Sequence, residues 1–385
     1  MAWKVEFLAT APPTDPTSGL SRGVWELAST LAARQHTVRV LYPSPGLEPP
    51  PAKTGAVPVP VPVLNVPRRP FGRDITIGRN ASTLVDPSAD LLVGNDEKAG
   101  ALDARLTRPE GRPVFAMSVH DVALHTFDTL RPLEPNRGMR QRLGNFLDRR
   151  TLRSLEGRAL SRARLILVGS ELNRKLLGEY YEVHPRRVRL LPHGVPDPLD
   201  VGSRADARLA LHVPQDVPLV TFVGRNAERQ GLPIALEAFR RIRVFFPGAR
   251  FAVVGSSPKT EPGVLSLGVV DEATKARVLR AADVFLFPAR YEGFGLAPRE
   301  AMRYGVPAVV SAHVPLEGIP APQAIRVVSS DDPADYASEL AELFADPALA
   351  HALGAAGKKA ADEFSYARMA DHFEEMFRPL LNGRP

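Results

Sequence analysis

The hydrophobic pattern along the chain alternates between short apolar runs and longer segments with one apolar face. Runs such as 4–10, 37–43, 89–95 and 113–119 are predominantly apolar, which is typical of strands buried on both faces of a sheet. Residues 22–34 place apolar side chains three or four positions apart, as in a helix that covers such a sheet. Further strands are expected at 164–170, 187–194, 218–224, 250–256, 264–268, 283–288, 306–311 and 325–330, and further helices at 137–161, 171–181, 231–246, 272–281, 297–304, 333–345, 347–361 and 366–381.

Residues 43–70 break this rhythm, because ten of them are prolines and 57–63 reads VPVPVPV. Proline has no amide proton to donate to a sheet, so we expect an extended or edge strand here and not a central one. The strand–helix rhythm restarts at 218, after a loop-rich stretch. The pattern therefore predicts an α/β fold of two Rossmann-like, doubly wound domains, 1–195 and 196–365, that face a central cleft.

The composition is that of a folded protein without cysteine chemistry. The chain has 385 residues, 44% of them apolar, a length that favours two domains. The absence of cysteine excludes disulfides, thiolate metal sites and a cysteine nucleophile. No apolar run approaches the roughly 18 residues of a membrane span, and we read no secretory leader at the N-terminus. The expected compartment is therefore the cytoplasm.

The net charge of +6 is concentrated in one stretch. Residues 131–164 hold ten arginines against Glu134, Asp148 and Glu156. Nucleic-acid binding is not expected, because no recognition module or interleaved aromatic residues accompany the arginines. We expect an apolar stripe beside them to pack on the sheet; the alternative is peripheral contact of 131–164 with the inner face of an anionic membrane. The stripe consists of Met139, Leu143, Phe146, Leu147 and Leu155.

The segment 290–305, RYEGFGLAPREAMRYG, carries the densest chemical signal. It follows a buried strand and leads into a helix, and Gly293 and Gly295 allow a ligand to approach the backbone closely. Backbone amides at the start of a helix form an anion site suited to a diphosphate. Glu292 and Glu300 are placed to accept hydrogen bonds from hydroxyl groups attached to that anion. From the residues alone, an equal alternative is a tight turn in which Glu300, in the first helical turn, complements the helix dipole.

Several ordered motifs resemble glycosyltransferase family 4, retaining enzymes of the GT-B fold. Glu292 and Glu300, separated by seven residues that include GFG, resemble the signature of that family. FVGRNAERQG at 222–231 is similar to its glycine–arginine–lysine–glycine element, and SVHD at 118–121 fits its N-terminal half. Residues 364–377 resemble its terminal helix, which in this fold crosses back to the N-terminal domain.

This resemblance covers nearly the whole chain and implies a function for each domain. Residues 1–195, with the C-terminal helix 366–385 packed against them, would form the acceptor-binding domain. Residues 196–365 would form the nucleotide-sugar-binding domain.

The resemblance also implies a role for each matching residue. Glu300 would hold the ribose hydroxyls, and Glu292 the hydroxyls of the transferred sugar. Arg225 would neutralise the diphosphate, and His120 would approach the donor sugar and the β-phosphate. The catalytic candidates are thus Glu292, His120 and Arg225. The donor-binding candidates are Arg225, Arg229, Gln230, Glu300, Gly293, the amides of Phe294, Gly295 and Leu296 at the diphosphate, Val269 and Val270 at the base, and Gly19, where the N-terminal domain would close on the diphosphate.

One position departs from the family pattern. Gln230 stands where the family has a lysine, so either Arg229 beside it supplies the charge or one phosphate contact is missing. No metal site or resident cofactor is expected, because the remaining histidines show no ligand spacing. Asp331 and Asp332 are expected to begin helix 333–345 and not to bind a metal.

The implied function is metal-independent transfer of a hexosyl unit, with retention, from a nucleoside-diphosphate sugar. UDP-glucose is the first expectation for the donor and GDP-mannose the second. The acceptor would be a glycan, a lipid-linked sugar or a small molecule. Two alternatives stay open: a catalytically silent nucleotide-sugar-binding protein, suggested by Gln230, and a nucleotide-sugar epimerase of the same fold.

Overall fold

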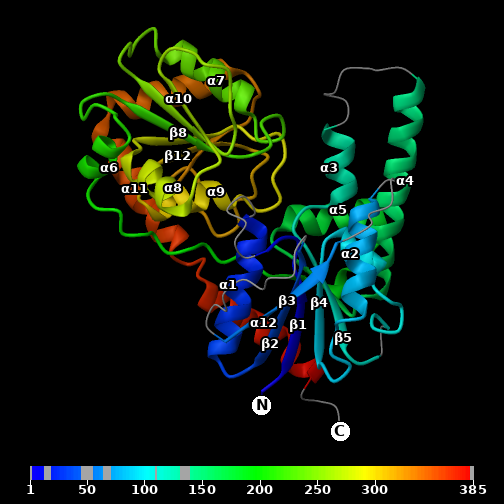
Figure 1. Ribbon diagram of the computed structural model, residues 1–385. Helices are drawn as coiled ribbons and strands as arrows, with labels where there is room; N and C mark the ends of the chain where they lie inside the picture. Colours follow the sequence, from blue (N-terminus) through cyan, green and yellow to red (C-terminus); the bar gives the residue numbers. More distant parts are fainter. Residues whose placement is uncertain are drawn as a thin grey trace. The chain divides into compact units, whose positions relative to one another are not determined.

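The apolar runs of the sequence form two parallel β-sheets, each in a unit of its own (Figure 1). In this computed structural model, unit 1 comprises Met1–Gly194 and Tyr366–Pro385, and unit 2 comprises Val195–Ser365. Both units have the Rossmann-like α/β architecture that the pattern predicts. The structure describes residues 2–12, 19–44, 55–63, 71–108, 111–130 and 139–381.

Within the described residues, the sheet of unit 1 has seven parallel strands in the order β3-β2-β1-β4-β5-β6-β7. All five residues of the central strand β4 (Leu91–Asn95) are buried, as expected for a strand between two layers of helices. The proline-rich β3 (Val57–Pro62) pairs with β2 at the edge of the sheet, which confirms the position predicted from its alternate prolines. The other strands are β1 (Lys4–Leu8), β2 (Thr37–Ser44), β5 (Val114–Val119), β6 (Leu165–Val168) and β7 (Val188–Leu190).

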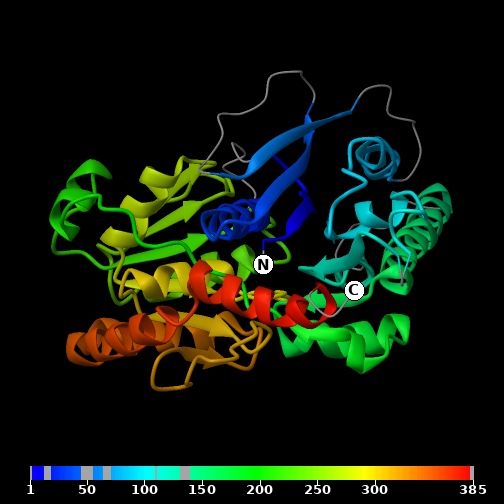
Figure 2. The same ribbon diagram turned by 90° about the horizontal axis from the view of Figure 1, so that it is seen from below.

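The last helix of the chain belongs to unit 1. Helix α12 (Tyr366–Leu381) packs beside α1 (Gly19–Ala33) (Figure 2). Its Phe373 and Phe377 are buried in the same apolar cluster as Phe7 of β1. The end of the chain therefore completes the core of unit 1. The other helices of this unit are α2 (Gly72–Ser82), η1 (Glu97–Ala101), α3 (Ala123–Leu130), α4 (Met139–Arg162), α5 (Glu171–Tyr181) and η3 (Pro185–Arg187).

Helices α2 and α3 were not expected from the sequence, because contacts distant in the chain stabilise them. A Cβ added to Gly78 of α2 would lie 2.4 Å from the carbonyl oxygen of Lys98, so the glycine allows α2 to pack closely on η1. At the start of α3, the Glu156 carboxylate of α4 accepts hydrogen bonds from the amides of Ala123 and Leu124, at 2.9 and 3.2 Å. A carboxylate from another helix thus caps α3.

The prediction that the apolar stripe of α4 packs on the sheet is wrong for the first half of the helix. Leu143, Phe146 and Leu147 are 60%, 60% and 46% exposed, whereas Leu155 is fully buried. The physical reason is that α4 packs against η1 and α3, and its fully buried residues lie in the C-terminal half. None of the described helices combines the length and the hydropathy that crossing a membrane requires.

The sheet of unit 2 has six parallel strands in the order β10-β9-β8-β11-β12-β13. Its apolar core includes Phe222, Phe251, Phe285 and Phe287, all fully buried. The strands are β8 (Leu219–Val223), β9 (Arg250–Val254), β10 (Val264–Gly268), β11 (Val284–Phe287), β12 (Ala308–Ser311) and β13 (Arg326–Val328). The helices are α6 (Arg204–Ala210), α7 (Leu232–Ile242), α8 (Glu272–Ala281), α9 (Leu296–Arg303), α10 (Pro333–Ala345) and α11 (Pro347–Ala361).

The strand order of unit 2 reverses direction between β8 and β11, which pair with each other. At such a switch point the loops that leave the carboxyl ends of the two strands diverge, and ligands of open α/β sheets bind there. The loop after β8 carries Arg225, and the loop after β11 carries Glu292 and the glycine-rich turn. The fold therefore brings the two principal sequence motifs to the same edge of one sheet.

Candidate functional site

Two loops of unit 2 meet at the β8/β11 switch point. We call residues 224–231 loop A and residues 288–295 loop B. The amide of Arg290 in loop B donates a hydrogen bond of 2.8 Å to the carbonyl of Arg229 in loop A. Gly231 has a φ of +74°, and an added Cβ would lie 1.7 Å from the carbonyl oxygen of Pro288. Only glycine permits this close approach of the two backbones.

Loop B ends in a left-handed glycine that begins a helix. Gly295 has a φ of +79° and is the N-cap residue of α9. It has no side chain that could cap the helix, so the amides of the first turn can serve a bound anion instead. The side chain of Phe294 is buried, so it packs into unit 2. Gly293 and Gly295 are buried as well, so the whole turn is packed within unit 2.

A fully buried arginine, which sequence reasoning missed, holds this turn in place. Arg299 of α9 donates hydrogen bonds to the carbonyl oxygens of Phe294 and, at 3.1 Å, Pro315. Its guanidinium carbon lies 4.1 Å from the ring centre of Phe294 and 4.8 Å from that of Phe364. Burial lowers the pKa of Arg299 to about 10, against the opposing effect of Glu317 and Glu292, so the guanidinium stays charged at neutral pH.

Glu300 lies beside a lysine that the sequence analysis did not single out. The Lys275 Nζ of α8 lies 2.9 Å from Glu300 Oε2 and 3.1 Å from Glu272 Oε2. Glu300 is the fifth residue of α9, so the expectation that it lies in the first helical turn is wrong. Because the dipole effect fades within one turn, Glu300 is better explained by its pairing with Lys275.

Loop A places three of the candidate residues. Gln230 Oε1 accepts a 3.0 Å hydrogen bond from the amide of Asn226, within the loop. Arg229 Nη2 lies 3.7 Å from Glu292 Oε2, and both side chains are about 15% exposed. The cation beside Glu292 is therefore Arg229 and not position 230. Arg225 itself is exposed and directly follows the first glycine of the loop.

The two valines expected near the base directly follow β10, the edge strand that β9 separates from β8. Val269 is 56% exposed, whereas Val270 packs against a small apolar cluster that includes Val278 of α8. The carbonyl of Gly268 accepts a 2.6 Å hydrogen bond from the amide of Gly255. This bond ties the end of β10 to the loop after β9, at the same edge of the sheet as loops A and B.

In unit 1, His120 is part of a buried polar chain. Its Nε2 lies 3.0 Å from Asn95 Oδ1, and its Nδ1 lies 3.2 Å from His193 Nε2. The Asn95 amide nitrogen donates to the carbonyl of Leu8, so Oδ1 is the acceptor and His120 carries its proton on Nε2. Burial lowers the pKa of His120 to about 4. The imidazole is therefore neutral at physiological pH, and its partners Asn95 and His193 are candidate residues that the sequence did not reveal.

Gly19 is the first residue of α1 and is exposed. The turn before it, residues 13–18, lies outside the described residues. Asp332 caps α10, accepting a 2.9 Å hydrogen bond from the amide of Ala334, which confirms the expected start of that helix. Within the described parts of the chain, no three His, Asp or Glu side chains gather as a metal site would require.

Comparison with known families agrees with this arrangement. The family model described as "Glycosyltransferase Family 4" matches residues 17–197, and the one described as "Glycosyl transferases group 1" matches residues 217–346. Between them the two models match most of both units. The chain belongs to this glycosyltransferase family.

Relatives in the glycosyltransferase family carry several names. The D-inositol 3-phosphate glycosyltransferase of Segniliparus rotundus is 32% identical over 249 residues, 59% of this chain and 55% of that protein. The alpha-maltose-1-phosphate synthase of Mycolicibacterium smegmatis is 26% identical over 79% of this chain and 85% of that protein. The match thus spans little more than half the length of the inositol phosphate relatives.

Solved structures confirm the GT-B fold of the family. The sucrose-phosphate synthase from Thermosynechococcus elongatus superposes with a TM-score of 0.81 at 20% identity, covering 99% of this chain and 100% of that one. At this level of identity the likeness establishes the fold alone.

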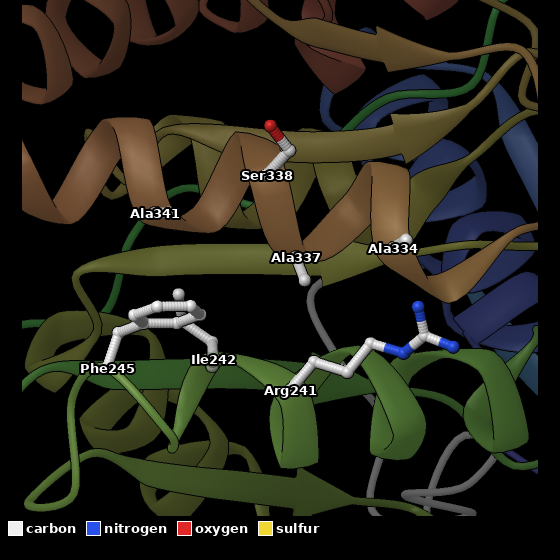
Figure 3. A pocket seen from close by; sticks show the side chains of 7 residues that line it. All are labelled: Arg241, Ile242, Phe245, Ala334, Ala337, Ser338 and Ala341. Atoms are coloured by element: carbon white, nitrogen blue, oxygen red, sulfur yellow. The ribbon is translucent and has the colours of Figure 1, made fainter.

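A hollow of unit 2 lies away from loops A and B. It separates α7 from α10, and Figure 3 shows Ile242 and Phe245 on one side and Ala337 on the other. Its lining is apolar except for Arg241 and Ser338. Because it lacks carboxylates and glycine-rich backbone, it does not resemble a sugar-nucleotide site.

Proposed function

We propose that the protein transfers a hexosyl unit from a nucleoside-diphosphate sugar to an acceptor, with retention of configuration and without a metal ion. The observation that carries this proposal is the junction of loops A and B at the β8/β11 switch point. There the uncapped start of α9, two arginines and two carboxylates share one edge of the sheet. A diphosphate needs the cations and amides, whereas ribose and sugar hydroxyls need the carboxylates.

The proposed roles divide the donor among these residues. The amides of 294–296 bind the diphosphate, and Arg225 neutralises it. Glu300 accepts hydrogen bonds from the ribose, held in position by Lys275, and Glu292 accepts them from the sugar. Val269 and Val270 offer backbone groups to the base.

Arg229 takes over the charge that Gln230 lacks. The support for this role is the position of Arg229 in loop A, where its Nη2 lies 3.7 Å from Glu292 Oε2 of loop B. A guanidinium can bind phosphate oxygens through two donors at once, so the departure from the family's lysine does not remove the cation.

The proposed chemistry requires little from the protein except positioning and charge. The bond between the anomeric carbon and the β-phosphate oxygen breaks, and the acceptor oxygen attacks the same face. The acceptor proton passes to the departing phosphate. Because negative charge grows on that phosphate, preorganised amides and Arg225 stabilise the transition state more than the bound donor.

For unit 1 we propose acceptor recognition, together with the contacts of Gly19 and His120 to the donor. His120 would act as a neutral hydrogen-bonding group and not as a proton carrier, because its pKa is lowered to about 4. UDP-glucose and GDP-mannose are the first donors to test. Relatives named for D-inositol 3-phosphate make that compound the first acceptor to test.

The test combines binding and turnover. A donor that binds the native chain raises its melting temperature, so a thermal-shift screen over nucleoside-diphosphate sugars identifies the donor.

Arg225→Ala and Glu300→Ala should then each lower the rate of sugar transfer by roughly 10²–10³, while the exposed Lys359→Ala should not. Unchanged transfer in both site variants would refute the assignment. Binding without transfer to any acceptor would favour the silent binder, and epimerised donor would favour the isomerase.

A further inference from the structure

We infer that the first half of α4 is a docking surface for an anionic phospholipid membrane. The inference does not rest on the proposed transfer activity, because membrane binding is measured without donor or acceptor. It rests on apolar side chains that α4 exposes to solvent, although the sequence predicted that they would pack on the sheet.

Three large apolar side chains lie together on this surface. Leu143, Phe146 and Leu147 have the spacing i, i+3 and i+4, which places them on one face of the helix, and about half or more of each side chain is exposed. Single exposed apolar residues are ordinary, but three neighbouring ones mark an interaction surface. In this part of α4, from 141 to 150, no residue is fully buried.

Arginines surround these apolar side chains. Arg142, Arg150 and Arg153 are exposed, and α4 as a whole carries seven arginines against Asp148 and Glu156. Arg149 is neutralised by Asp128, at 2.8 Å, so it is not counted as part of the surface. We call Arg142, Leu143, Phe146, Leu147, Arg150 and Arg153 the α4 surface.

Charge complementarity selects the occupant. Exposed arginines attract anionic headgroups, and leucine and phenylalanine insert at the boundary of headgroups and acyl chains. An acidic protein would satisfy the arginines but would offer no reason for the three apolar side chains between them. A purely apolar partner would leave the arginine charges desolvated. A membrane with anionic lipid satisfies both kinds of residue.

The first experiment is co-sedimentation of the full chain with vesicles. We expect binding to vesicles of phosphatidylglycerol and phosphatidylcholine, weak binding to phosphatidylcholine alone, and a loss of binding as salt is raised. Replacing the three arginines by glutamine should lower the partition coefficient by about a hundredfold, from about 1 kcal/mol per residue. Replacing the three apolar residues by serine should lower it by about a hundredfold or more, since even half burial of each side chain contributes about 1 kcal/mol. All six side chains are exposed, so neither variant should change the melting temperature.

Matched controls separate this surface from general effects. Val244→Ser with Phe245→Ser changes two exposed apolar residues of unit 2, and Arg73→Gln with Arg108→Gln and Arg186→Gln removes three exposed arginines of unit 1 outside α4. Both controls should bind vesicles as the unaltered chain does. If the control variants lost as much vesicle binding as the α4 variants, a specific role of the α4 surface would be refuted.

The second experiment reports insertion directly. The chain has two tryptophans, Trp3 and Trp25, and both are buried, so Phe146→Trp adds an exposed reporter. Its emission should shift to the blue with anionic vesicles and stay unchanged with neutral ones. No binding at low salt, or binding without the shift, would overturn the inference. A dimer that the serine variant abolishes, without vesicle binding, would also overturn it and assign the α4 surface to a second copy of the chain.

Discussion

Glu292 and Glu300 each lie beside a cation from another segment of unit 2, Arg229 and Lys275 respectively. Two carboxylates near a diphosphate would repel it, and each pair removes most of that unfavourable charge. The side chains concerned are at most 17% exposed, so water screens these pairs less than it screens surface pairs. In the proposed site, each cation also orients its carboxylate before the donor binds.

Lys275 offers the sharpest test of this idea. We expect Lys275→Met to weaken binding of a ribonucleoside diphosphate about tenfold, the value of one charge-assisted hydrogen bond. The loss should be much smaller for a 2′,3′-dideoxy analogue, because that ligand offers no hydroxyl to Glu300. Isothermal titration calorimetry measures both affinities.

Two further variants define the outcome for Lys275. Lys275→Arg should restore part of the affinity, and the exposed Lys359→Met should have no effect. If Lys275→Met weakened both ligands equally, or tightened either, Lys275 would not position Glu300 for the ribose.

Glu156 gives unit 1 a pH dependence that can be measured. Burial raises its pKa to about 7, although Tyr181 and the amides of Ala123 and Leu124 favour the ionised form. The folded chain then binds a proton that the unfolded chain releases near pH 4.5, so this stabilisation is full below pH 4.5 and is lost as pH rises through 7. This shift of the Glu156 pKa from 4.5 to about 7 contributes about 3 kcal/mol to the free energy of unfolding at low pH.

Glu156→Gln should remove this contribution. Between pH 4.5 and 7.5, the unfolding free energy of the unaltered chain should fall by about 3 kcal/mol relative to the variant. Urea unfolding at a series of pH values measures the difference, which cancels other titrating groups such as His120. Parallel curves for the two proteins would show that Glu156 is ionised throughout.

At the scale of elements, the site depends on how closely loops A and B approach. Gly231 and Gly305 have nearly equal positive φ angles, +74° and +76°. A Cβ on Gly231 would collide with Pro288, whereas nothing lies within 4 Å of one on Gly305. The two glycines therefore separate the effect of backbone conformation from that of close packing.

Gly305→Ala should cost about 1 kcal/mol of stability, the strain of a left-handed alanine. Gly231→Ala should cost at least about 2 kcal/mol more and should weaken donor binding, because loop A must move away from loop B. Thermal unfolding and donor titration of both variants measure these effects. Equal costs at the two positions would mean that the loops separate without penalty.

At the scale of the whole molecule, the chain returns to unit 1 after completing unit 2. Phe373 of α12 is fully buried in the core of unit 1, and Phe239 of α7 is equally buried in that of unit 2. Phe373→Ala and Phe239→Ala should each cost about 3–5 kcal/mol.

Hydrogen exchange distinguishes the two variants. Phe373→Ala should lower the protection of β1 and its neighbours, and Phe239→Ala that of β8 and its neighbours. Loss of protection in unit 2 from Phe373→Ala would contradict the assignment of α12 to the core of unit 1.

The sequence alone determined most of the elements, because their signals are local. Helices α5, α8, α10, α11 and α12 begin and end at the predicted residues, since apolar periodicity and nearby capping residues define them. The ordered motifs likewise indicated the family and the GT-B fold. Glu292 and Glu300 stood out because a glycine-rich loop with paired carboxylates has a recognisable spacing, whereas Arg225 was indicated only by the family resemblance.

Only the tertiary structure decided which groups meet. Lys275 and Glu300 are 25 positions apart, and Glu156 caps α3 from more than 30 positions away, so neither contact leaves a periodic signal. The tertiary structure also decided which side chains are buried. Arg299 is buried despite its charge, and Leu143 is exposed despite its apolar side chain. The physical reason is that the hydrophobic pattern along the sequence indicates only whether a residue favours burial or exposure. The partners of that residue depend on which distant segments the strand order of the sheet brings to the same edge.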